Sequence, residues 1–330
     1  MQYKAIKLVK RPDSHITPDL FETVILETPD LEDGQFLLKQ THMSLDPAMK
    51  GWMSADTGSY IPPVKLGDVM RSSGVAEVVE SRNDAFPVGI RVVGMIGWTE
   101  YAVSSGEGLN TLPSDVSAEV VLCVLSLPGL TAYQGLMEIG KPKAGETLVV
   151  SGAAGSVGSM VGQIGKAEGL RVVGTAGTDE KCRWLEDELG FDKSINYKSE
   201  DLALQIAEAT PDGIDLYFEN TGGPVQHAVF YRMNAHGRII VCGMIADYNT
   251  DKPSPGPNWM NIIRKRLIIQ GFTMPDHWDN VPRIMDKLAT YYAAGKLKYR
   301  AHKLDGLESA IEGINLLFTG ANTGKLMVEL

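Results

Sequence analysis

A glycine-rich turn between a β-branched run and a segment with helical apolar spacing constrains this fold more than any other feature. Residues 147–158 read Thr-Leu-Val-Val-Ser-Gly-Ala-Ala-Gly-Ser-Val-Gly. Ala154 and Gly155 keep side-chain bulk out of the turn, so its backbone can approach a pyrophosphate, while Gly158 lets the following helix pack against the strand. The first amides of that helix would face the anion. The pattern predicts a dinucleotide-binding strand, turn and helix, although Ala153 stands where the usual fingerprint begins with glycine. The alternative is a glycine-rich turn that binds nothing.

Strand-like and helix-like segments alternate from about residue 117 onwards, as a doubly wound parallel sheet requires. The second strand, 170–177, follows the glycine-rich turn at the distance expected of a βαβ unit. Further predicted strands are 193–197, 214–219, 237–243 and 266–272, and the predicted helices are 179–190, 200–209, 224–234 and 281–294. The fold class is therefore α/β, with a nucleotide-binding domain over residues 117–296.

The first 116 residues have a different sequence pattern. Short predicted strands broken by Gly and Pro replace the alternation of strands and helices. Runs at 34–41, 74–80 and 91–97 predict strands of a β-barrel-like module without long helices. The tail, 297–330, returns to short strands around one helix. We expect the tail to join residues 1–116 in one discontinuous β-rich domain.

Composition narrows the class of partner. The formal net charge of −10 argues against nucleic acid or an anionic membrane. No apolar run approaches the roughly 20 residues that span a bilayer, and the N-terminus resembles a strand rather than a signal peptide. The three cysteines, Cys123, Cys182 and Cys242, form neither a disulfide framework nor a metal set, so each is expected to be a small buried hydrophobe. A cytoplasmic location follows as the expectation.

Residues 247–258 form a predicted loop directly after a strand of the nucleotide-binding sheet. Its prolines cannot donate hydrogen bonds to a helix or a strand ladder. Ligands of such sheets lie beyond the carboxyl ends of the strands. The loop is therefore a mobile lid or a passive connection.

Five separated motifs resemble one known family over nearly the whole chain. They lie at residues 44–52, 153–158, 217–223, 242–249 and 322–325. They look like the zinc-independent medium-chain dehydrogenases/reductases, in the branch of the 2-alkenal, curcumin and prostaglandin/leukotriene reductases. The resemblance implies a Rossmann domain beside a discontinuous GroES-like catalytic domain. It also implies a homodimer, for which the predicted edge strand 266–272 offers a pairing surface.

The resemblance implies NADPH as the cofactor and several residues that would contact it. Lys181 matches a residue that pairs with the 2′-phosphate, and Asn322 matches one that closes over the nicotinamide. The remaining implied contacts are Ala154, Gly155, Ser156, Val157, Gly158, Tyr197, Asn220, Cys242, Gly243, Met244, Ile245, Tyr248 and Phe272.

The residues themselves also favour NADPH over NADH. An NAD site usually has an acid at the end of the second strand, where this chain has Ala176-Gly177 and leaves room for a phosphate. Asp179 and Glu180 stand nearby, and either is an alternative ribose contact. In another interpretation, Lys181 is a solvated helix residue.

The sequence predicts no metal site. Zinc-dependent relatives need a Cys with a Gly-His-Glu run and a cluster of four cysteines, and this chain has neither. Residues 67–74, Gly-Asp-Val-Met-Arg-Ser-Ser-Gly, stand where Gly-His-Glu is expected. The six histidines (15, 42, 227, 236, 277 and 302) show no ligand spacing.

The implied reaction is hydride transfer to the β-carbon of an apolar enone or enal. Tyr248 is the candidate catalytic residue, since its phenol would stabilise the enolate or relay a proton. In the alternatives Tyr248 only packs on the ligand, or the cofactor ribose polarises the carbonyl. The candidate pocket walls are Trp52, Met53, Tyr60, Met244, Tyr248, Trp259 and Met274.

Substrate choice is the open point. Many members have Asp-Pro-Tyr-Met-Arg at residues 46–50, where this chain has Asp-Pro-Ala-Met-Lys, so Ala48 leaves space in the pocket. Arg71 is either a salt-bridging residue or a substrate contact. Two other functions remain alternatives: an NADPH:quinone reductase and a non-catalytic NADPH-binding protein.

Overall fold

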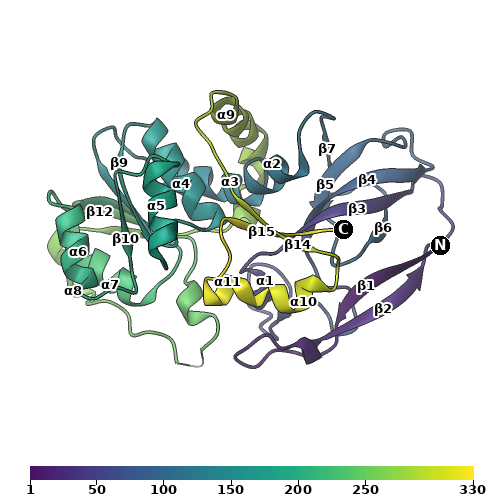
Figure 1. Cartoon of the computed structure of the whole chain (residues 1–330), viewed down its shortest axis with the longest axis horizontal. Helices are drawn as coiled ribbons and strands as arrows, with labels where there is room; N and C mark the ends of the chain where they lie inside the picture. Colours follow the sequence, from purple (N-terminus) through teal and green to yellow (C-terminus); the bar gives the residue numbers. More distant parts are fainter. Residues whose placement is uncertain (251) are drawn as a thin grey trace. The chain divides into compact units, whose positions relative to one another are not determined.

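The computed structural model describes residues 1–250 and 252–330, and these form two compact units (Figure 1). The β unit comprises Met1–Leu122 and Ala301–Leu330, and the α/β unit comprises Cys123–Arg300. The β unit is therefore discontinuous in sequence, with the α/β unit inserted between its two parts.

The α/β unit contains a six-stranded sheet in which every neighbouring pair is parallel. Its strands are β8 (Thr147–Val150), β9 (Arg171–Ala176), β10 (Lys193–Asn196), β11 (Ile214–Glu219), β12 (Met233–Val241) and β13 (Ile268–Gly271). Their order is β10-β9-β8-β11-β12-β13, so the chain reverses its direction across the sheet at β8. In doubly wound sheets ligands bind beyond the carboxyl ends of the strands at this reversal.

Helices cover both faces of this sheet (Figure 1). They are α3 (Leu127–Tyr133), the π-helix η2 (Gln134–Gly140), α4 (Ser156–Ala167), α5 (Asp179–Asp187), α6 (Leu202–Ala209), α7 (Gly223–Arg232), α8 (Met260–Lys265) and α9 (Val281–Ala293), with short 3-10 helices η3 (Ile245–Asp247) and η4 (Met274–Asn280). Tyr217 of β11 packs with Ile206 of α6 and Val229 of α7 in one buried cluster. On the other face, Gly165 of α4 lies against Leu148 of β8. The doubly wound arrangement predicted from the alternating segments is confirmed.

The predicted elements of this unit differ from the observed ones mainly at their ends. The largest difference concerns β12, which begins at Met233, although the sequence predicts a helix to residue 234 and a strand from 237. Met233 is fully buried and pairs with Ile214 of β11, so tertiary packing starts the strand early. His236 then adopts a φ of 65°, within the irregular part of the β11–β12 register.

The β unit is built on short helices and on strands that are antiparallel except for the parallel pair β14–β15. Its elements are β1 (Gln2–Leu8), η1 (Pro18–Leu20), β2 (Phe21–Glu27), β3 (Phe36–Ser44), α1 (Met49–Met53), β4 (Ser73–Ser81), β5 (Arg91–Met95), β6 (Tyr101–Ser104), β7 (Asn110–Leu112), α2 (Ala118–Cys123), β14 (Ala301–Asp305), α10 (Ser309–Gly313), α11 (Asn315–Thr319) and β15 (Lys325–Glu329). The main sheet has the order β14-β15-β3-β4-β5-β7, and β6 pairs with β3.

The C-terminal tail joins this sheet through β15, which pairs with β3 at Met327 and Ser44. The sequence predicts one helix in the tail, whereas the structure has two five-residue helices, α10 and α11, on either side of Ile314. Gly313 ends the first of them, and glycine is a weak helix former.

The unit boundaries lie a few residues beyond the expected ones at 116 and 297. Glu119 forms an ion pair with Lys303 of β14, which connects the start of α2 to the β unit. Lys298 donates from its backbone to Gln163, and Arg300 pairs with Glu188, so both remain with the α/β unit.

The expectation that no apolar run reaches membrane-spanning length is wrong. Within the described residues, the helical stretch Ala118–Gly140 is long and apolar enough to pass that test. However, 72% of its most apolar window is buried inside the structure. Core helices of soluble proteins pass the same test, so this stretch is weak support for a membrane span.

Candidate functional site

The glycine-rich turn after β8 leads directly into α4. Gly155 is the N-cap of α4 and makes no side-chain cap, so the first amides of the helix, at Ser156, Val157 and Gly158, face an acceptor supplied from outside the helix. A Cβ added at Gly158 would lie 2.4 Å from the carbonyl oxygen of Gly152, so only glycine allows this approach. Ala154 is buried beside it. This geometry suits a pyrophosphate.

The end of β9 carries the features that distinguish a 2′-phosphate from a hydroxyl. A Cβ added at Gly177 would lie 3.2 Å from Oη of Tyr197, so glycine keeps that hydroxyl accessible. Lys181 lies in the first turn of α5, and its backbone N–H donates to Oγ1 of Thr178 over 3.2 Å. Burial lowers the pKa of Lys181, and the positive charge of Lys198 lowers that pKa further. Lys181 follows β9 and Lys198 follows β10, so the two lysines lie after neighbouring strands of the sheet.

Lys198 is a candidate that the sequence analysis missed. Its Nζ lies 5.9 Å from the ring centroid of Tyr197, the residue before it. The signal was its position next to Tyr197 at the end of β10, on the strand beside β9. Asp179, an alternative ribose contact in the sequence, accepts a hydrogen bond from Nδ2 of Asn196 at 2.7 Å. Its charge is thereby turned toward β10, and the basic pair favours a phosphate.

Asn220 and residues 242–245 gather where β11 and β12 end. Nδ2 of Asn220 donates to the carbonyl of Ser151 at 2.7 Å, which ties the β11 turn to the β8 turn. The carbonyl of Asn220 accepts from the N–H of Ile245 at 3.2 Å. Burial and the charge of Glu219 raise the pKa of Cys242 to about 12, so this thiol is protonated at neutral pH. The structure brings these predicted contacts together at the carboxyl ends of the strands.

Tyr248 lies against the same backbone. Its Oη accepts a hydrogen bond from the N–H of Met244 at 3.4 Å and would lie 3.1 Å from a Cβ added at Gly243. The side chain keeps 36% of its surface exposed. Burial raises the pKa of Tyr248, so the phenol keeps its proton and can donate it in a hydrogen bond.

The predicted lid, 247–258, includes residue 251, which lies outside the described residues. One contact within the loop and one contact between the loop and α7 are observed. Oδ1 of Asp247 accepts from the N–H and the hydroxyl of Ser254, each at 3.0 Å. Nε2 of His227 in α7 lies 2.6 Å from the carbonyl of Pro255. Motion of this loop stays a prediction.

Phe272 and Met274 follow β13 and differ in exposure. The ring of Phe272 packs edge-on against Phe218, with centroids 6.4 Å apart, and remains partly exposed. Met274 is buried, so it offers almost no surface to a ligand. Its choice as a pocket wall is not supported, because η4 turns this side chain inward.

Two other candidate walls, Trp52 and Met53, are buried in the core of the β unit. They lie on α1, whose buried positions also include Met49. A helix of this spacing turns Met49, Trp52 and Met53 toward the core, so Met53 does not form an accessible wall. Ala48 packs partly buried against the same core. Arg71 makes no ion pair within the described residues and instead lies 5.6 Å from the Trp52 ring centroid.

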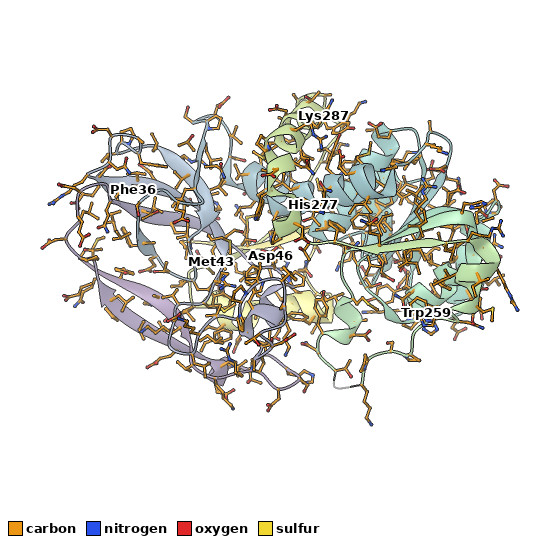
Figure 2. The ribbon with its side chains drawn as sticks, turned by 180° about the vertical axis from the view of Figure 1, so that it is seen from behind. Phe36, Met43, Asp46, Trp259, His277 and Lys287 are labelled. Atoms are coloured by element: carbon orange, nitrogen blue, oxygen red, sulfur yellow. The ribbon has the colours of Figure 1, made fainter. Side chains whose placement is uncertain are left out.

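Tyr60 and Trp259 are the exposed candidates, with 54% and 59% of their surface accessible. Figure 2 labels Trp259 beside the start of α8, and its ring packs edge-on against Phe230 of α7. The pocket-wall roles of both residues remain predictions.

In the β unit, the first and last family motifs meet at a buried ion pair. Nζ of Lys325 lies 2.5 Å from Oδ1 of Asp46, the residue labelled in Figure 2, and it also donates to the carbonyl of Leu45 at 2.9 Å. Nδ2 of Asn322, predicted to close over the nicotinamide, donates to the carbonyl of Gly324 at 2.9 Å. Asn322 therefore lies on a turn that Lys325 anchors.

Possible metal ligands do not cluster in the part of the chain that the structure describes. No group of three or more His, Cys, Asp or Glu side chains there is arranged to hold an ion. The three cysteines are free thiols.

Comparison with known protein families assigns both parts of the chain. Residues 4–112 match the family described as the N-terminal domain of oxidoreductase, and residues 156–290 match the family described as zinc-binding dehydrogenase.

Relatives cover nearly the full length. The chain is 42% identical to the NADPH-dependent curcumin reductase of Escherichia coli over 98% of this chain and 95% of that protein. It is 39% identical to the NADP⁺-dependent 2-alkenal reductase of Nicotiana tabacum over 93% and 90% of the two chains. The crystal structure of CurA from Vibrio vulnificus in complex with NADPH matches with a TM-score of 0.93 at 40% identity, covering 99% and 98%.

Proposed function

The chain belongs to the zinc-independent medium-chain dehydrogenases/reductases, in the branch of the curcumin and 2-alkenal reductases, and on that premise we propose that it reduces the carbon–carbon double bond of α,β-unsaturated ketones and aldehydes with NADPH. The observation that carries this proposal is the basic pair beside an accessible tyrosine hydroxyl, formed by Lys181, Lys198 and Tyr197. It stands where a dinucleotide with a 2′-phosphate places its extra charge.

The α/β unit serves as the NADPH-binding domain in this proposal. The free amides at the start of α4 hold the pyrophosphate, and Lys181 with Tyr197 holds the 2′-phosphate. Residues 242–245, Phe272 and Asn220 run along the nicotinamide half. The β unit serves as the substrate domain in this proposal.

NADPH, when bound, supplies the hydride for the β-carbon of the substrate. Negative charge then develops on the carbonyl oxygen, and a donor must meet it. Tyr248 fits this role because its phenol is protonated at neutral pH and its oxygen already accepts from Met244 N–H. Its O–H is thus directed by that contact to an acceptor elsewhere.

Loss of NADPH absorbance with a panel of acceptors tests the function. We expect turnover on a 2-alkenal and an aryl enone, with a product saturated between the α- and β-carbons, and none on the saturated aldehyde. Faster turnover on a quinone than on any enal would assign the chain to quinone reduction. Tight NADPH binding without turnover on any acceptor would identify a non-catalytic binding protein and overturn the proposal.

The cofactor assignment has its own matched pair of variants on α5. Lys181→Ala is expected to raise the KM for NADPH by about 10- to 100-fold, because it removes a charge-assisted contact, and to leave the KM for NADH unchanged. Arg183→Ala removes an exposed positive charge from the same helix and should change neither value. Equal effects of the two variants would contradict the phosphate contact.

Tyr248→Phe distinguishes catalysis from packing. We expect kcat to fall by about 100-fold, with the KM for NADPH little changed, because one hydrogen-bond donor to the developing charge is removed. An unchanged kcat would assign Tyr248 to packing and polarisation to another group.

We further propose that the protein is a cytoplasmic homodimer that needs neither membrane nor nucleic acid. The net charge of −10 and three free thiols support this setting. The edge strand β13 supports the dimer, since Ile268 is exposed on it and, among the described residues, β13 pairs with β12 alone. Ile268→Lys should convert a dimer to a monomer in size-exclusion chromatography with light scattering, and a monomeric unmodified chain would refute this assembly.

A further inference from the structure

A carboxylate that forms no ion pair within the described residues lies fully buried at the end of β11. Oε1 of Glu219 accepts hydrogen bonds from the hydroxyl of Ser151 at 2.7 Å and from the N–H groups of Thr221 and Gly222 at 2.8 and 2.9 Å. Its Oε2 is buried and has no hydrogen-bond partner among residues 1–250 and 252–330. A buried acceptor with this many donors fixes each of them in place.

The donors belong to different turns of the sheet. Ser151 directly follows β8, and its Oγ also accepts from the N–H of Asn220 at 2.8 Å. The backbone carbonyl of Glu219 accepts from the N–H groups of Cys242 and Gly243 at 2.9 and 3.1 Å, just after β12. A single residue therefore connects the ends of three neighbouring strands.

The same three turns carry the proposed cofactor contacts. The β8 turn continues into the start of α4, the β11 turn contains Asn220, and the β12 turn contains residues 242–245. Tyr217 lies in the same strand as Glu219, and its buried hydroxyl has no partner within the described residues. The Glu219 carboxylate thus joins the β8 and β11 turns through hydrogen bonds, and Asn220 joins both of them to the β12 turn.

The opposite end of β11 offers a built-in comparison. Oδ2 of Asp215 accepts from the N–H of Thr147 in β8 at 2.9 Å, and its Oδ1 accepts from Nδ2 of Asn234 in β12 at 2.8 Å. Asp215 therefore connects the same strands by the same type of bond, but at their amino-terminal ends. Loss of either carboxylate should destabilise the sheet. Only the loss of Glu219, which lies at the carboxyl ends of the strands, should also weaken ligand binding.

We propose that Glu219 is a positioning residue, whose carboxylate holds the β8 and β11 turns in the arrangement that receives the dinucleotide before it binds. This rests on the proposed function only in taking NADPH as the ligand. Turns that are already ordered lose less conformational freedom on binding, so the affinity is higher. Glu219 acts as an acceptor in this role, and a glutamine that keeps an oxygen at the Oε1 position retains it.

The test is the Kd for NADPH, measured by nucleotide fluorescence on the full chain. Glu219→Ala is expected to raise Kd by about tenfold or more, and Glu219→Gln to restore it to within about threefold of the unmodified protein. Asp215→Ala should leave Kd unchanged within about twofold. Equal increases in Glu219→Ala and Asp215→Ala, or no increase in either, would overturn the proposal.

A second readout needs no ligand. Amide hydrogen exchange of the free protein should become faster at residues 151–158 and 220–223 in Glu219→Ala but not in Asp215→Ala. If Glu219→Ala does not fold, Ser151→Ala removes one donor to the carboxylate, and it should raise both Kd and exchange to a smaller extent. Unchanged exchange and Kd in Ser151→Ala would then refute the role.

The effect of Glu219→Ala on NADPH binding can be tested separately from the proposed reduction of enones. A chain that binds NADPH, loses that binding in Glu219→Ala and turns over no enone would keep this inference and discard the proposed reaction. A chain that reduces enones with the same Kd in Glu219→Ala and Asp215→Ala would do the reverse.

Discussion

Each unit buries one carboxylate behind its motif residues, but the two carboxylates are held in different ways. In the β unit, Asp46 and Lys325, 8% and 2% exposed, form an ion pair, and Ser44 also donates to Asp46. In the α/β unit, Glu219 accepts from hydroxyl and amide donors and forms no ion pair with any residue that the structure describes. One site balances charge with charge, whereas the other relies on neutral donors.

The difference follows from what each site connects. Asp46 and Lys325 are separated by 279 residues, so their pair closes the β unit by joining its first and last motifs. The donors to Glu219 come from turns that the parallel strands already bring together. Removing one member of an ion pair leaves an uncompensated buried charge, whereas removing an acceptor leaves unsatisfied neutral groups. Stability should therefore depend more on the β-unit site, and ligand binding more on the α/β-unit site.

The largest effect on stability is expected for Lys325→Met. Asp46 would remain buried without its cation, so the free energy of unfolding should fall by about 3–5 kcal/mol in urea denaturation. The double variant Asp46→Leu with Lys325→Met removes both charges and should recover most of that loss. If the double variant is no more stable than the single one, the pair is not the reason for the loss.

An intermediate effect is expected for Glu219→Ala. The Ser151 hydroxyl and the amides of Thr221 and Gly222 would lose their acceptor, which should lower the free energy of unfolding by about 2–3 kcal/mol. Glu219→Gln keeps an acceptor and should lose less than about 1 kcal/mol. Thermal and urea denaturation of both variants without NADPH measure this. A loss as large as that of Lys325→Met would erase the contrast between the two sites.

The smallest effect, of opposite sign, is expected for Tyr217→Phe. The Tyr217 hydroxyl is buried and makes no hydrogen bond of good geometry in the described part of the chain, although the side chains of Ser151, Glu219 and Thr221 lie near it. Its removal should therefore raise the free energy of unfolding by at most about 1 kcal/mol. Burial and the charge of Glu219 raise the pKa of Tyr217 well above its ordinary value, so the substitution removes a neutral hydroxyl. Destabilisation in the urea transition would reveal a hydrogen bond to this hydroxyl.

Much of the α/β unit was predictable because its signals are local. Strand β11 was predicted with its observed ends, 214–219, since a short apolar run bounded by turn residues needs no distant partner. The glycine-rich turn was predicted for the same reason, as close approach depends on the residues of the turn itself. Helix α9 ends one residue before the expected 294.

The site was less predictable because side-chain burial depends on distant segments. Met53 and Met274 were expected to line a pocket, and both are buried. Hydrophobicity alone does not distinguish a core residue from a pocket wall, since both are apolar. Lys198 was missed because its approach to Lys181 arises only when β10 pairs with β9.

The sequence by itself determined that this chain has a doubly wound nucleotide-binding unit, that it belongs with the NADPH-dependent reductases, and that a phosphate rather than an acid-held hydroxyl suits the end of β9. These conclusions depend on glycines, on the hydrophobic periodicity of the strands and on short motifs, and each of these signals can be recognised within a few residues. Only the tertiary structure decided that Lys325 pairs with Asp46 and that Glu219 joins three turns. Burial and partnership are properties of residues that folding brings together, and spacing along the chain does not record them.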